Sequence, residues 1–137
     1  MPYDIEHSVL WSAICNRFPD RRSDIVSVRY VSIPEITDLN SRYRTTKSPT
    51  NVLTFSYTDD LPYEHDIALC SDIAEAEAKQ RGIVLRDYMA LLLTHAMLHA
   101  VGLDHEQSAA DDKKMRILER EIVSECGFIP VALKDVY

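Results

Sequence analysis

The sequence has little positive charge for its size. Its 137 residues include 15 Lys and Arg against 22 Asp and Glu, which gives a formal net charge of −7. This balance argues against a broad basic surface for nucleic acid, because phosphate binding depends on clustered cations. Any attraction to RNA must therefore be local. One short basic segment is available, and its Arg42, Arg44 and Lys47 are candidates for contacts with RNA.

Cysteines and long apolar runs are also scarce. Cys15, Cys70 and Cys126 are far apart and form no C-x-x-C pair, so reduced thiols are favoured over a disulfide or a cysteine-bound zinc. The longest apolar run, residues 89–101, is interrupted by a threonine and two histidines, which predicts a buried helix instead of a membrane span. The first residues lack the pattern of a signal peptide. We therefore expect a cytoplasmic protein without a membrane partner.

Hydrophobic periodicity predicts one domain over residues 1–137, of the α/β (α+β) class, with a short central mixed sheet packed by about five helices. We expect helices at residues 5–18, 34–43, 71–82, 85–101 and 108–127, and strands at 25–32, 51–56 and 65–70. The second and third strands are joined too briefly for a helical crossover, so they should be antiparallel. Ser71 is expected to cap the third helix and Gly82 to end it.

Three of the five histidines follow the pattern H-x3-H-x5-H at His95, His99 and His105. Residues four apart on a helix project from one face, so the first two can bind one ion together. Gly102 can adopt the left-handed conformation that ends a helix and turns the chain toward the third histidine. Three imidazoles leave one position of a tetrahedral metal open, which indicates one catalytic Zn²⁺ per chain.

This spacing is shared with the metzincin proteases, H-E-x-x-H-x-x-G-x-x-H, which use the Glu as general base. Ala96 occupies that position here, and its methyl group cannot accept a proton, so the protease hypothesis loses its central group. Asp104 is a candidate for orienting an imidazole or for proton transfer. Arg44 is the natural cation to stabilise charge on an anionic substrate. A non-catalytic protein whose zinc mainly holds the fold also stays open.

Three segments together resemble one known family. Residues 95–105, H-A-M-L-H-A-V-G-L-D-H, resemble the H-G-x-L-H-L-x-G-Y-D-H signature of the YbeY family of bacterial ribosomal-RNA maturation endoribonucleases. Residues 40–44, N-S-R-Y-R, and 49–55, P-T-N-V-L-T-F, are similar to its N-x-x-Y-R and P-T-D/N-V-L-S-F segments. Residues 65–70, H-D-I-A-L-C, are similar to its G-D-I-x-I-C strand. The chain departs from these motifs at Thr54, His65, Ala96, Ala100 and Leu103. We also expect the family's initial strand to be shortened or absent.

The resemblance implies a metal-dependent endoribonuclease that prefers single strands. It would act in maturation of the 3′ end of small-subunit (16S) rRNA and in ribosome quality control. His95, His99 and His105 would be its zinc ligands and Arg44 its catalytic arginine. Its partners would be RNA and the small ribosomal subunit, with the proteins of that subunit or an assembly GTPase. The alternative is a ribosome-assembly factor without catalysis, in which the zinc is mainly structural.

Overall fold

The computed structural model describes residues 7–43, 51–102 and 109–130 of the chain. Within them the elements follow the predicted order of helices and strands. They are α1 (His7–Arg17), the 3-10 turn η1 (Pro19–Arg21), β1 (Ile25–Tyr30), α2 (Ile33–Tyr43), β2 (Val52–Tyr57), β3 (Glu64–Leu69), α3 (Ser71–Arg81), α4 (Leu85–Ala100) and α5 (Ala109–Glu125). This order, with a mixed sheet, confirms the predicted α+β class.

The sheet of the described residues has three strands in the order β1-β3-β2. β3 pairs with β2 in the antiparallel direction, as predicted, and with β1 in the parallel direction. Because successive side chains of a strand point to opposite faces, the central strand is buried on both sides. His65, Ile67 and Leu69 are buried on one face of the sheet, and Ala68 is buried on the other.

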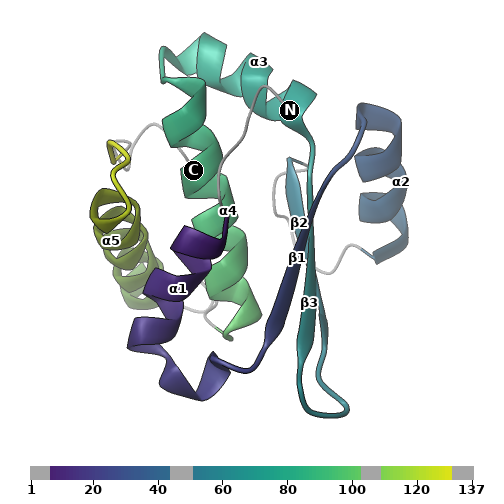
Figure 1. Cartoon of the computed structure of the whole chain (residues 1–137). Helices are drawn as coiled ribbons and strands as arrows, with labels where there is room; N and C mark the ends of the chain where they lie inside the picture. The colour runs from purple at the N-terminus through teal and green to yellow at the C-terminus, as the bar shows by residue number, and fades with distance from the viewer. Residues whose placement is uncertain (1–6, 44–50, 103–108, 131–137) are drawn as a thin grey trace.

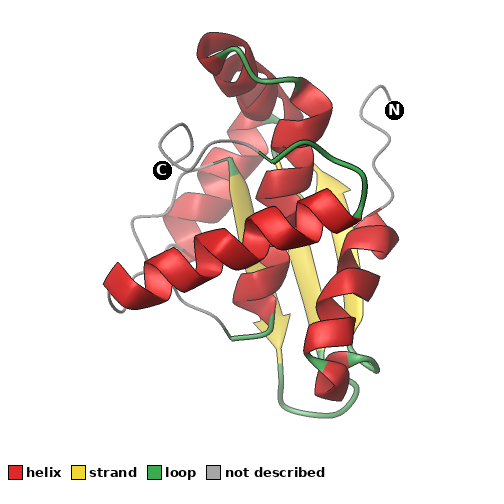
Figure 2. Cartoon of the chain, turned by 90° about the vertical axis from the view of Figure 1, so that its left-hand side faces the viewer, coloured by secondary structure: helices red, strands yellow, loops and turns green. Residues whose placement is uncertain are grey.

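The helices form unequal layers on the two faces of the sheet (Figure 1). α2 covers one face, where Val31 and Ile36 pack with Ala68. α1 and α4 cover the other face, and α5 packs on the side of α4 away from the sheet (Figure 2). α4 therefore lies between the sheet and α5, which explains why its sequence is apolar nearly all round.

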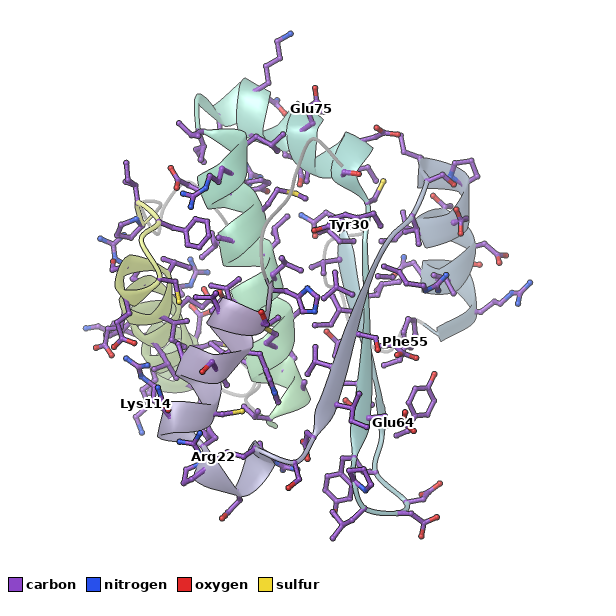
Figure 3. All side chains as sticks on the ribbon, viewed as in Figure 1. Arg22, Tyr30, Phe55, Glu64, Glu75 and Lys114 are labelled. Atoms are coloured by element: carbon purple, nitrogen blue, oxygen red, sulfur yellow. The ribbon has the colours of Figure 1, made fainter. Side chains whose placement is uncertain are left out.

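Side chains fill the layer between the sheet and α4, as Figure 3 shows. Leu93 and Met97 of α4 are fully buried in the same core cluster as Ile67 of β3 and Ile122 of α5. The described part of the chain contains no helix with the length and hydropathy that a membrane span requires. The side chains of α4 pack against the sheet on one side and against α5 on the other.

The helix ends follow from local backbone chemistry. Gly82 ends α3 in the left-handed conformation, at φ 68°, as predicted. The prediction that Ser71 caps this helix was wrong, because Cys70 is the capping residue and Ala74 N donates to its carbonyl oxygen at 3.0 Å. α4 begins at Leu85, where it was expected, and ends at Ala100, one residue before the predicted end. Gly102 follows with a φ of 98°.

Candidate metal centre

Two of the predicted ligands meet on the central helix. His95 and His99 are four residues apart on α4, so their imidazoles extend from the same side of the helix. Their Nε2 atoms are 3.2 Å apart, and the ring planes are inclined by 76°. His95 is only 6% exposed, whereas His99 is half-buried. His95 therefore lies in the protein interior, and His99 lies closer to the solvent on the same side of α4.

The distance between the two nitrogens fits a shared metal ion. Zinc binds imidazole nitrogen at about 2.0–2.1 Å, so two ligands at a tetrahedral angle lie about 3.3 Å apart. The observed 3.2 Å is close to this value, and at this distance the two imidazoles also form a hydrogen bond with each other. The residues present therefore fit zinc as two neighbouring ligands of one tetrahedral site.

A buried carboxylate that the sequence analysis did not identify lies behind His95. Glu119 Oε2 of α5 is 2.5 Å from His95 Nδ1. Glu119 is 1% exposed, and it lies 24 residues from its partner in the sequence. A carboxylate accepts hydrogen bonds, so this contact places the proton of a neutral His95 on Nδ1 and the lone pair on Nε2. The nitrogen that carries the lone pair is the one that faces His99.

The sequence does contain a signal for Glu119. The buried stripe of α5 includes Met115, Ile122 and Val123, and position 119 lies between them at the spacing of one helix face. A carboxylate at a core position is expensive to bury without a hydrogen-bond partner. Glutamate on an otherwise apolar stripe was thus a detectable anomaly, although the sequence did not say which residue it contacts.

Ala96, at the position that bears the metzincin base, lies in the core of the protein. Ala96 is fully buried and belongs to the main core cluster. Its carbonyl oxygen accepts a hydrogen bond from Thr54 Oγ1 of β2 at 3.2 Å. The methyl group of Ala96 therefore contributes to the packing of the core.

The remaining site predictions fall mainly outside the described residues. His105, Asp104, Arg44 and Lys47 lie in segments 44–50 and 103–108, outside the residues that the structure describes. Consistent with this, residues 7–43, 51–102 and 109–130 contain no group of three His, Cys, Asp or Glu side chains arranged for a metal. Arg42 is described; it lies on the last turn of α2, exposed, and its guanidinium is 3.3 Å from Asp38.

The start of β2, directly after residues 44–50, is held by a buried polar network. Asn51 Nδ2 donates to Glu77 Oε1 of α3 at 2.7 Å, and Cys70 N donates to the Asn51 carbonyl oxygen at 2.9 Å. Tyr88 of α4 donates its hydroxyl to the same Glu77 oxygen at 3.0 Å. Burial, together with the nearby Glu77 carboxylate, raises the pKa of Tyr88, so its phenol stays protonated and can donate.

Fold and site together define a small α+β domain whose central helix carries a histidine pair suited to a hydrolytic metal ion. The family model described as "Endoribonuclease YbeY" matches residues 8–127. The chain therefore belongs to the YbeY endoribonuclease family, as its sequence motifs predicted. Its class of activity is that of a hydrolase that cleaves RNA.

Individual relatives agree with the family model. The chain is 41% identical to the endoribonuclease YbeY of Delftia acidovorans over 103 residues, which cover 75% of this chain and 68% of the relative. It is 44% identical to the endoribonuclease YbeY of Ralstonia nicotianae over 105 residues, covering 75% and 56%. The fold is similar to the solution structure of TM1509 from Thermotoga maritima, with a TM-score of 0.56, 26% identity, and coverage of 90% and 87%.

Proposed function

We propose that the chain is a zinc-dependent endoribonuclease, specific for single-stranded RNA, that acts in maturation of the 3′ end of 16S rRNA and in ribosome quality control. Family membership supports the cleavage of RNA. The observation that carries the metal dependence is the 3.2 Å separation of His95 Nε2 and His99 Nε2. One YbeY-like domain over residues 1–137, in the cytoplasm, would hold this activity.

The zinc would be held by His95, His99 and His105, with the fourth position open. When bound, zinc supplies a Lewis acid that polarises a phosphoryl oxygen or lowers the pKa of a water molecule. Among the chain's own groups, Arg44 stabilises the charge that develops on the scissile phosphate. Asp104 orients an imidazole or transfers a proton.

The charge of the chain bears on how it would find its substrate. A net charge of −7 gives no general attraction to RNA. Arg42 and Lys47 would add local contacts to the backbone of the bound strand. The small ribosomal subunit, its proteins or an assembly GTPase would then supply the positioning that bulk electrostatics does not provide.

The experiment combines metal content, folding and cleavage on the same preparation. Zinc is measured by mass spectrometry before and after chelation, folding by circular dichroism, and cleavage with matched single-stranded and double-stranded RNA. We expect the stripped protein to stay folded, because the core of α4 is built from apolar contacts with the sheet and α5. Cleavage of single strands should disappear and return when zinc is added.

Two other results would contradict the proposal. Unfolding of the stripped protein would favour the assembly factor with a structural zinc. Full cleavage after verified removal of the metal would exclude a catalytic metal ion. The biological substrate is tested separately, by mapping the 3′ end of 16S rRNA in cells that lack the protein. An unchanged end in those cells would exclude the role in maturation.

A further inference from the structure

We infer that Glu119 is a positioning residue of the metal centre: its carboxylate fixes the tautomer and orientation of His95, so that Nε2 presents its lone pair to the metal. This inference rests on the proposed zinc site. It adds to that site a residue from α5, an element that carries none of the predicted ligands.

Burial shows that Glu119 is not a solvated surface acid. Its side chain is 1% exposed, and it shares a helix face with Met115 and Ile122, which are both buried. A polar or charged group in such surroundings destabilises the fold unless it is hydrogen-bonded. The 2.5 Å contact with His95 Nδ1 supplies a hydrogen bond of this kind. Charge-assisted contacts of a carboxylate are among the short and strong ones.

The contact selects one of two forms of the ring. A neutral imidazole carries its proton on one nitrogen and its lone pair on the other. With Glu119 as acceptor, the proton is on Nδ1 of His95. The opposite form would direct a lone pair at the carboxylate and an N–H at the metal position beside His99, which would prevent binding.

The carboxylate has two consequences for affinity. It holds the ring in the orientation that brings Nε2 to 3.2 Å from His99 Nε2, so less freedom is lost when a metal binds. It also makes the imidazole a stronger electron donor and adds a negative charge close to a cation in a buried setting. Outer carboxylates of this type contribute about 10–100-fold to metal affinity in other proteins.

The test is the zinc dissociation constant of Glu119→Gln, measured by competition with a chromogenic chelator. Glutamine keeps the size of the side chain but removes its charge, and its NH2 group can stabilise the wrong ring form. We expect zinc affinity to fall about 10–100-fold. The matched control is Glu121→Gln on the same helix, because Glu121 is 57% exposed and lies 3.7 Å from Arg17. The affinity of this control should stay within about twofold of the wild type.

A second measurement needs no substitution. Long-range 1H–15N correlation spectra of the metal-free wild type report which nitrogen of His95 is protonated. We expect the proton on Nδ1. A proton on Nε2 in the wild type would overturn the inference even if Glu119→Gln failed to fold.

The outcomes separate the inference from the proposed function. A wild type that binds no zinc refutes the proposed zinc site. A wild type that binds zinc, with equal affinity in folded Glu119→Gln, refutes only the role of Glu119. Weaker binding in Glu119→Gln, unchanged binding in Glu121→Gln and a proton on Nδ1 together support it.

Discussion

Two buried histidines of this fold each contact a carboxylate, and they differ in what meets the second ring nitrogen. His95 of α4 contacts Glu119 through Nδ1, and its Nε2 faces another imidazole, that of His99. His65 of β3 contacts Asp24 Oδ2 through Nε2 at 2.8 Å, and its Nδ1 lies 2.8 Å from Ser56 Oγ. Both histidines are almost inaccessible to solvent, at 6% and 0% exposure.

The difference teaches that a buried histidine–carboxylate pair does not by itself indicate a metal ligand. Both ring nitrogens of His65 have hydrogen-bonding partners. Asp24 directly precedes β1 and Ser56 lies on β2, so the side chain links β3 to β2 and to the residue before β1. Its role is structural. His95 keeps one nitrogen directed at a second imidazole, that of His99, which is the arrangement that the proposed shared ion would require.

This comparison also accounts for one departure from the family motifs. His65 stands where the G-D-I-x-I-C strand has glycine. In this chain the imidazole is accommodated because Asp24 and Ser56 supply an acceptor and a hydroxyl at hydrogen-bonding distance. The ring of Trp11 on α1 lies 6.1 Å from it and helps to cover it. The substitution thus has a structural explanation.

The sharpest test of the comparison removes His99, the imidazole that faces His95, and separately removes His65. His99→Ala should reduce zinc from about one per chain to a small fraction and reduce RNA cleavage by more than about 100-fold, because a direct ligand matters more than an outer partner. His65→Ala, studied in folded protein at low temperature, should keep its zinc. Metal content and cleavage rate measure both. Full zinc in His99→Ala would show that the ligands are wrongly assigned.

Substitution of Arg44 tests the proposed catalytic role of a residue that belongs to neither histidine–carboxylate contact. Arg44→Ala should reduce cleavage by about 10²–10³-fold, the usual loss when one group that stabilises transition-state charge is removed. Zinc content and melting temperature should not change. Arg29→Ala, which removes an exposed arginine from β1, is the control for loss of charge. Equal cleavage by Arg44→Ala in a nuclease-free preparation would remove Arg44 from the mechanism.

The structural role of His65 predicts a loss of stability. His65→Ala should lower the free energy of unfolding by about 2–3 kcal/mol, since it removes the hydrogen bond of the buried Asp24 carboxylate and leaves it the ion pair with Arg21 at 3.8 Å. Urea titration measures this loss, and His7→Ala at the start of α1 is the control. A loss of unfolding free energy no larger than that of His7→Ala would mean that the Asp24–His65 contact contributes little to folding.

The smallest effect is expected for the hydrogen bond between Ser56 Oγ and His65 Nδ1. Ser56→Ala should cost about 1 kcal/mol, because Nδ1 of His65 loses its donor. For a domain of this size that corresponds to a melting temperature lower by about 3 °C in a calorimetric scan. Ser27→Ala, at an exposed position of β1, is the matched control. Equal shifts for the two variants would indicate that the His65 ring is held by Asp24 alone.

Much of the fold was predictable because its signals are local. The alternation of Val26, Val28 and Tyr30 predicted β1, and all three pack against the main core. The apolar run predicted α4 to within one residue. The cap of α3 was assigned incorrectly because Ser71 has the favoured side chain, whereas the backbone of Cys70, leaving β3, already begins the helix. The parallel pairing of β1 with β3 depends on packing across the whole sheet and had no local signal.

The sequence by itself determined that His95 and His99 share a helix face, because the helical repeat brings residues four apart together whatever surrounds them. Only the tertiary structure decided what lies behind each histidine. Glu119 reaches His95 because α5 packs on α4, and Asp24 and Ser56 reach His65 because the strand register aligns them. Such contacts join residues distant in sequence, so they are set by the packing of layers and not by local periodicity.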